Sequence, residues 1–320
     1  MPAPVPTPLP EFAVALRPPD LSPWRSGDAG VPGFITRRAA SPGPHLALLG
    51  LMHGNEFAGA IVLDRLLRAG FMPRRGVLTM GFVNLAAFER FDPRRPTASR
   101  FIDEDLNRVW DEAVLDGPRT SRELARAREI LPLIQTVDVL VDLHSMLWPA
   151  DPAILSGPSG KGLALARGIG TPSLVIADSG HANGKRLIDH RRFVDPETKA
   201  AAVLVEAGQH WEADTVAAAE AAVAGVLRHL DMLPANAPLP APPRVPQRVA
   251  EVTAAITAAT TQFAFVQAWR GGDVVKRRNT LIALDGASEV RTPHDDCLLV
   301  MPSLRPSRGH TAVRLARFVG

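Results

Sequence analysis

Between about residue 34 and residue 233, short apolar runs alternate with longer stretches in which apolar residues recur every three or four positions. This rhythm predicts an α/β fold, in which helices cover a central sheet. We expect strands near residues 46–51, 77–83, 137–143, 153–156, 173–176 and 202–205. We expect helices near residues 57–69, 121–134, 161–168 and 214–229.

The pattern changes after residue 233. The proline-rich stretch LPANAPLPAPPRVP cannot continue a helix and predicts a semi-rigid linker up to residue 246. Short β-like segments separated by turn signals follow it. The sequence therefore predicts a proline-rich N-terminal arm over residues 1–33, a main α/β domain over 34–236 and a smaller β-rich domain over 247–320.

Composition and charge narrow the range of partners. Hydrophobic residues make up 46% and charged residues 22% of the chain, and the formal net charge is only +3. The sequence contains no basic cluster that would indicate nucleic-acid binding. It also contains no apolar run that approaches the roughly 18 residues of a membrane span. The N-terminus lacks the basic-then-apolar order of a signal peptide. Cys297, the single cysteine, excludes an intrachain disulfide and favours the reducing cytoplasm.

The most informative residues follow two of the predicted strands. His53 and Glu56 stand three residues apart, in a His-Gly-Asn-Glu turn between a strand and a helix, and His144 ends the run Asp-Leu-His. Taken separately, these motifs favour a surface pair and a histidine bonded to backbone. Together they complete the two-histidine, one-glutamate ligand set of a catalytic zinc site with an open fourth position. We expect one zinc ion per chain.

The block RFIDEDLNR crowds six polar groups into nine residues, from Arg100 to Arg108. One interpretation is a solvated segment with exposed ion pairs, which contribute little to stability. The other is a substrate clamp, because a planar guanidinium suits a carboxylate and an asparagine adds a directional donor. The residues alone leave both interpretations open.

Glu206 ends the apolar run AAVLV. A carboxyl group in that position is partly desolvated, which raises its pKa and suits it to proton transfer. A solvent-facing acid at a strand end fits the segment equally well.

These motifs, HGNE, RFIDEDLNR, DLHS and VEAGQ, resemble in kind and order those of the aspartoacylase/succinylglutamate desuccinylase family. The resemblance covers about residues 45–210, and the β-rich C-terminal segment is similar in kind to the family's second domain. It implies a zinc-carboxypeptidase-like fold, with a mixed sheet flanked by helices, and a zinc amidohydrolase activity.

Carried over residue by residue, the resemblance implies roles for nine side chains. His53, Glu56 and His144 bind zinc, and Asp105 orients His53. Glu206 is the general base and acid, and Arg100 stabilises the oxyanion. The residues that bind substrate are Asn107 and Arg108, which hold a carboxylate, and Asn84, which lines the site.

The chain also departs from the family. It contains no tyrosine, and the family's further substrate-recognition arginine has three candidates here, Arg186, Arg191 and Arg192, none of which aligns. His181 and His210 lie near the predicted site in sequence, and we interpret them as surface loop histidines.

The sequence thus predicts a zinc-dependent deacylase of an N-acyl amino acid or related small amide that carries a carboxylate. One alternative is a zinc carboxypeptidase that acts on short peptides, and another is a non-catalytic metal- or ligand-binding relative. A homo-oligomer is compatible with the sequence.

Overall fold

The structure, a computed structural model, describes residues 10–180, 183–237, 239–241 and 246–319. The chain divides into two compact units. The large unit comprises the described residues within 14–146 and 152–248, and the small unit those within 1–13, 147–151 and 249–320.

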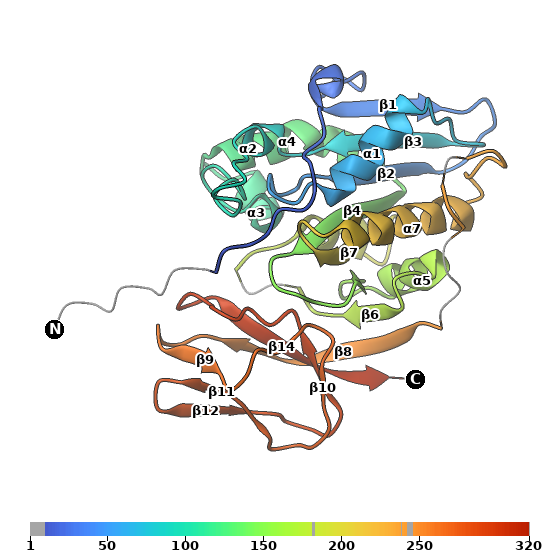
Figure 1. Ribbon diagram of the computed structural model, residues 1–320. Coiled ribbons are helices and arrows are strands. Elements are labelled where there is room, and N and C mark those ends of the chain that lie inside the picture. The colour runs from blue at the N-terminus through green and yellow to red at the C-terminus, as the bar shows by residue number, and fades with distance from the viewer. Residues whose placement is uncertain (1–9, 181–182, 238, 242–245, 320) are drawn as a thin grey trace. The chain divides into compact units, whose positions relative to one another are not determined.

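A mixed sheet forms the centre of the large unit (Figure 1). Its strands lie in the order β1–β3–β2–β4–β7–β5–β6. β3, β2, β4 and β7 run parallel, as do β5 and β6, whereas β1 is antiparallel to β3 and β5 to β7. The strands are β1 (Phe34–Arg38), β2 (His45–Gly50), β3 (Val77–Phe82), β4 (Val139–Met146), β5 (Ala153–Leu155), β6 (Leu174–Ala177) and β7 (Ala201–Gln209).

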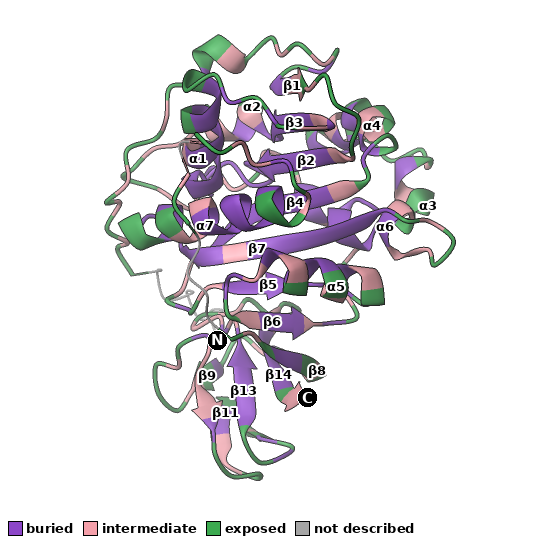
Figure 2. Ribbon diagram, turned by 90° about the vertical axis from the view of Figure 1, so that its right-hand side faces the viewer, coloured by how far each residue is buried: buried purple, intermediate pink, exposed green. Residues whose placement is uncertain are grey.

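The central strands read as continuous apolar runs because both faces of this part of the sheet are covered. β2, β4 and β7 are buried along almost their whole length (Figure 2). Each strand from β2 to β7 corresponds to one of the predicted apolar runs. β1 was not among the predicted strands, since its sequence FITRR carries two arginines and only its first two residues are buried.

Helices flank the sheet on both sides, and Figure 2 shows α1 and α4 on opposite sides of the strands. Ser121 and Ser159 each accept a hydrogen bond from a backbone N–H of the first turn, at the N-termini of α4 and α5. The helices are α1 (Ala58–Arg68), α2 (Leu85–Phe88), α3 (Glu112–Leu115), α4 (Arg122–Ile134), α5 (Gly160–Ile169), α6 (Arg191–Val194) and α7 (Ala213–His229), and the 3-10 turns are η1 (Ser22–Trp24), η2 (Leu106–Arg108) and η3 (Leu187–Asp189).

Two antiparallel sheets form most of the small unit. One contains β8, β14, β13 and β10 in that order, and the other contains β12, β11 and β9. The strands are β8 (Arg248–Thr257), β9 (Phe263–Phe265), β10 (Val274–Val275), β11 (Leu281–Asp285), β12 (Ser288–Arg291), β13 (Cys297–Val300) and β14 (Thr311–Val319). Cys297 is fully buried in an apolar core with Leu299, Val313 and Leu315.

The mixed sheet with flanking helices and the antiparallel strands of the small unit confirm the predicted fold class. Among the helices of the described residues, none combines the length and apolar character that would carry it across a membrane.

Candidate metal centre

The parallel strands β2, β4 and β7 deliver the candidate residues to one edge of the sheet. His53 and Glu56 lie in the turn between β2 and α1, and His144 lies near the end of β4. Glu206 pairs directly with His144 across the β4–β7 ladder. The carboxyl ends of adjacent parallel strands are where open α/β sheets gather functional groups.

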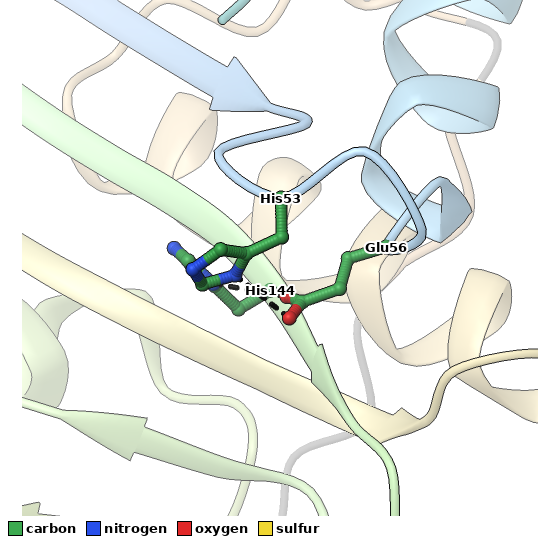
Figure 3. Close-up of side chains that lie close together, drawn as sticks. All are labelled: His53, Glu56 and His144. Carbon is green, nitrogen blue, oxygen red and sulfur yellow. Dashed lines mark hydrogen bonds and ion pairs between the residues drawn. The ribbon is translucent and has the colours of Figure 1, made fainter. Parts of the chain in front are cut away.

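His53, Glu56 and His144 converge closely enough to hold one cation (Figure 3). Their ligand atoms all lie within 4.8 Å of one another, and all three residues are buried. His53 Nδ1 lies 2.8 Å from Glu56 Oε1, and His144 Nδ1 lies 3.0 Å from Glu56 Oε2. Two imidazoles and one carboxylate are suitable ligands for zinc, and they leave a further coordination position.

Two aspartates bind the far side of the imidazole rings. His53 Nε2 lies 2.8 Å from Asp105 Oδ1, and His144 Nε2 lies 2.8 Å from Asp142 Oδ2. A carboxylate in this position accepts the Nε2–H proton, which leaves the Nδ1 lone pair of each ring directed at the shared glutamate. His53 Nδ1 is buried, and although it lies 2.8 Å from Glu56 Oε1, it forms no hydrogen bond with any of the described residues. A bound cation would give this nitrogen a partner.

Burial and neighbouring charges shift the pKa values of the cluster in opposite directions. Burial by itself would raise the pKa of Glu56, but His53 and His144 lower it well below its usual value. Burial would lower the pKa of His144, but Asp142 and Glu56 raise it well above its usual value. A metal ion bound there would compete with the His144 proton, because a ligating imidazole must be neutral.

Arg100 reaches the same cluster from the loop that precedes η2. Its Nη1 donates to Glu56 Oε1 at 2.8 Å, and its Nη2 donates to Asp105 Oδ2 at 3.2 Å. Nη2 also lies 3.0 Å from His53 Nε2, which is a close contact rather than a hydrogen bond when that nitrogen donates to Asp105. The structure therefore brings Arg100 and Asp105 together with the histidines and the glutamate.

Glu206 is half-buried, and its Oε2 is enclosed without a hydrogen-bond partner among the described residues. Burial raises the pKa of Glu206 to about 8, and the negative charge of Glu56 adds to this shift, while His144 and Arg100 oppose it. The structure thus places a carboxyl group with a raised pKa beside the cluster.

Asn107 and Arg108 lie in η2, next to the cluster. Asn107 Nδ2 lies 3.5 Å from His144 Nε2, and its Oδ1 accepts a hydrogen bond from Leu187 N at 2.9 Å. The Arg108 guanidinium donates to the Asn107 carbonyl oxygen at 2.7 Å.

The structure does not bring Asn84 into the cluster. Its Nδ2 donates to Glu123 Oε1, and its Oδ1 accepts from Ala87 N at the start of α2. Both polar groups of the side chain are thus used in contacts outside the cluster.

The three candidate recognition arginines are all engaged elsewhere. Arg186 is buried, and it forms bidentate pairs with Asp178 and Asp189. Arg191 forms exposed ion pairs. Arg192 Nε donates to the carbonyl oxygen of Val137, which lies between α4 and β4.

The interpretation of His210 as a surface histidine is wrong. His210 is only 2% exposed, and its Nδ1 lies 2.8 Å from the hydroxyl of Ser145, which follows His144. Burial lowers its pKa to about 4, so the ring is neutral at neutral pH. Its position directly after β7, in the apolar surroundings of Trp211, was the signal for burial. His181 lies outside the described residues.

Sequence reasoning also missed Asp142. It stands two residues before His144 on β4, and residues two apart on a strand point to the same face. The Asp-x-His spacing on a strand therefore carried the signal for a paired acid and imidazole.

Comparison with known proteins identifies the family of this chain. A family model described as succinylglutamate desuccinylase/aspartoacylase catalytic domain matches residues 42–230. The aspartoacylase of Xenopus tropicalis is 31% identical over 123 residues, which are 35% of this chain and 37% of that protein. The match thus spans just over a third of the length of this curated relative.

Solved structures share the fold. The succinylglutamate desuccinylase of Vibrio cholerae superposes with a TM-score of 0.68 at 17% identity, covering 89% of this chain and 85% of that one. Murine aminoacylase 3 superposes with a TM-score of 0.62 at 20% identity, covering 88% and 97%. At these identities the likeness establishes the fold alone.

Proposed function

Because the chain belongs to the succinylglutamate desuccinylase/aspartoacylase family, we propose that it is a zinc-dependent hydrolase that removes the acyl group from an N-acyl amino acid. The observation that carries the proposal is the paired arrangement of imidazole and carboxylate. Asp105 and Asp142 turn the Nδ1 atoms of His53 and His144 toward Glu56. This is the arrangement that fixes ring angle and tautomer in metal sites.

The chemistry that a zinc ion supplies at such a site is Lewis acidity, which activates water and polarises the scissile carbonyl. Glu206 is suited to accept the proton of the attacking water and to return it to the leaving amine, because its raised pKa allows both states near neutral pH. The positive charge of a cation beside it would bring that pKa closer to neutrality.

Arg100 and the η2 residues supply the remaining functions in this proposal. Arg100 lies at the cluster and can stabilise the negative charge that develops on the carbonyl oxygen. Asn107 and Arg108, which lie together in η2, would hold a free carboxylate on the substrate, because a planar guanidinium suits a carboxylate. Cys297 as the single cysteine is compatible with a reducing, cytoplasmic location.

An activity screen tests the proposal. The zinc-loaded protein would be assayed against N-acetyl, N-succinyl and longer N-acyl amino acids, with short peptides in parallel. We expect release of a free acid and an amino acid, and loss of the activity when a chelator removes the metal. Shortened peptides as the products would instead support a carboxypeptidase, and no metal-dependent turnover of either class would refute the proposal.

A further inference from the structure

Glu123 is a carboxylate buried at the first turn of α4, with only 1% of its surface exposed. Its Oε1 accepts hydrogen bonds from Ile102 N at 2.7 Å and from Asn84 Nδ2 at 3.2 Å. Its Oε2 accepts from Asp103 N at 3.0 Å and from Glu104 N at 3.3 Å. The carboxylate thus binds three consecutive backbone N–H groups of one loop.

Two side chains of the loop in turn accept hydrogen bonds from residues at the start of the helix. Asp103 Oδ2 accepts a hydrogen bond from Arg122 N at 2.8 Å, and Glu104 Oε1 accepts one from the hydroxyl of Ser121. Residues 102–104 and the α4 N-terminus therefore bind each other reciprocally, and we refer to this set of contacts as the α4 clasp.

The burial of the Glu123 carboxylate indicates that these contacts are needed to stabilise it. Burying a carboxylate is unfavourable in free energy unless the carboxylate is paired with a cation or fully hydrogen-bonded. Within the described part of the chain, no basic side chain forms an ion pair with Glu123. The loop N–H groups and Asn84 are its stabilising partners, so the loop conformation and the buried position of this carboxylate depend on each other.

In sequence, residues 102–104 lie between the residues that contact the candidate site. Arg100 precedes it by two residues, and Asp105 follows it directly, before Asn107 and Arg108. Arg100 and Asp105 both contact the His53–Glu56 pair, so a change in the backbone of 102–104 would move both side chains together.

We propose that Glu123, assisted by Asn84, is a positioning residue that holds Arg100, Asp105 and Arg108 in their working orientation. Among the described residues, no hydrogen bond or ion pair joins Glu123 to His53, Glu56 or His144, so it would act through the backbone of residues 102–104. The kinetic part of this inference rests on the proposed deacylase function, whereas the structural part does not. It also gives Asn84 an indirect role, through Glu123.

The first test needs no substrate. Glu123→Gln keeps the shape of the side chain but turns an N–H donor toward the loop N–H groups. We expect amide hydrogen exchange in residues 101–105 to accelerate about tenfold or more, while exchange in β4 and β7 stays unchanged. The matched control is Glu129→Gln, on the exposed face of the same helix, which should leave the loop unaffected. Unchanged exchange in the loop of Glu123→Gln would overturn the clasp.

Zinc binding provides a second readout that is independent of turnover. Because Asp105 orients His53, a displaced Asp105 should weaken the affinity for Zn²⁺ alone about tenfold, at the lower end of the usual effect of such partners. In an Asp105→Asn background, adding Glu123→Gln should have little further effect, since the contact through which it acts is already gone. Independent, multiplying losses in the double variant would contradict the positioning role.

Kinetics complete the test, using the N-acetyl amino acid that the wild-type enzyme hydrolyses fastest. At saturating zinc, Glu123→Gln should lower kcat through Arg100 and raise KM about tenfold through Arg108. The KM increase should shrink to less than about twofold in an Arg108→Ala background. A wild-type enzyme without deacylase activity would refute the proposed function, but the exchange and zinc measurements would still decide the role of Glu123. A KM increase of the same size in both backgrounds would refute the positioning role alone.

Discussion

Asp142 and His144 lie two residues apart on β4, and the Asp142 carboxylate meets His144 Nε2 at 2.8 Å. Both side chains therefore point to the same face of the strand, and the acid and the imidazole form a unit that the strand itself builds. Since the Nε2–H of His144 is directed to Asp142, its Nδ1 remains available at the cluster with Glu56.

The first prediction concerns this cluster. Elemental analysis of the purified protein should give about one zinc ion per chain, bound by His53, Glu56 and His144 at roughly 2.0–2.2 Å. His144→Ala should lose the metal, and Asp142→Asn should weaken binding by about 10- to 100-fold, as the loss of an orienting carboxylate does. A His144→Ala variant that bound zinc as tightly as the parent protein would remove His144 from the site.

The second prediction concerns the rate of proton transfer. Glu206→Gln should keep the fold and the metal while kcat falls by about 10² to 10⁴, the usual contribution of a placed acid–base group. Zinc content and circular dichroism serve as controls. If the variant turned over at nearly the parental rate, the buried His210 would become the next residue to replace.

A third prediction follows from the raised pKa of Glu206, about 8 against its usual 4.5. Between these two values the folded, metal-free chain holds a proton that the unfolded chain has released, so folding stability falls as the pH rises through this window. Glu206→Gln removes this dependence. Its melting temperature, measured with a chelator from about pH 5 to pH 8, should fall less than that of the wild-type protein; parallel curves would show that burial does not shift this group.

The two arginines of the loop and η2 should differ in their kinetic effects. Arg100 contacts the cluster and is proposed to stabilise negative charge that develops in the transition state, so Arg100→Ala should mainly lower kcat. Arg108 is proposed to bind a carboxylate that is present throughout the reaction, so Arg108→Ala should mainly raise KM. The same kinetic profile for both variants would contradict this division.

The last prediction concerns the substrate. Both Asp178 and Asp189 bind the Arg186 guanidinium, so this arginine is not available to a second carboxylate on the substrate. We therefore expect N-acyl amino acids without an acidic side chain to be hydrolysed at least as well as N-acyl aspartate or glutamate. Comparing one such substrate with its own methyl ester tests the clamp of Asn107 and Arg108. An equal kcat/KM for acid and ester would show that it is no carboxylate site.

How far the sequence predicted the site depended on how local each relationship was. His53 and Glu56 share one turn and His144 ends one apolar run, so short motifs placed them. The contact between Asn84 and Glu123 joins residues 39 positions apart, and no spacing rule links them. The burial of His210 and the saturation of Arg186 likewise depend on neighbours that only the folded chain supplies.

Because His144 and Glu206 pair within the β4–β7 ladder, evolutionary change is expected to affect this pair differently from the connecting segments around it. Backbone hydrogen bonds of the sheet hold His144 and Glu206 side by side on neighbouring strands, and this pairing does not depend on the surrounding loops. The residues of η2 and η3 lie on connecting segments, which tolerate substitution better than buried strands. In the proposed deacylase, sequence changes in those segments would therefore alter the acyl or amino-acid preference while the His144–Glu206 pair stays unchanged.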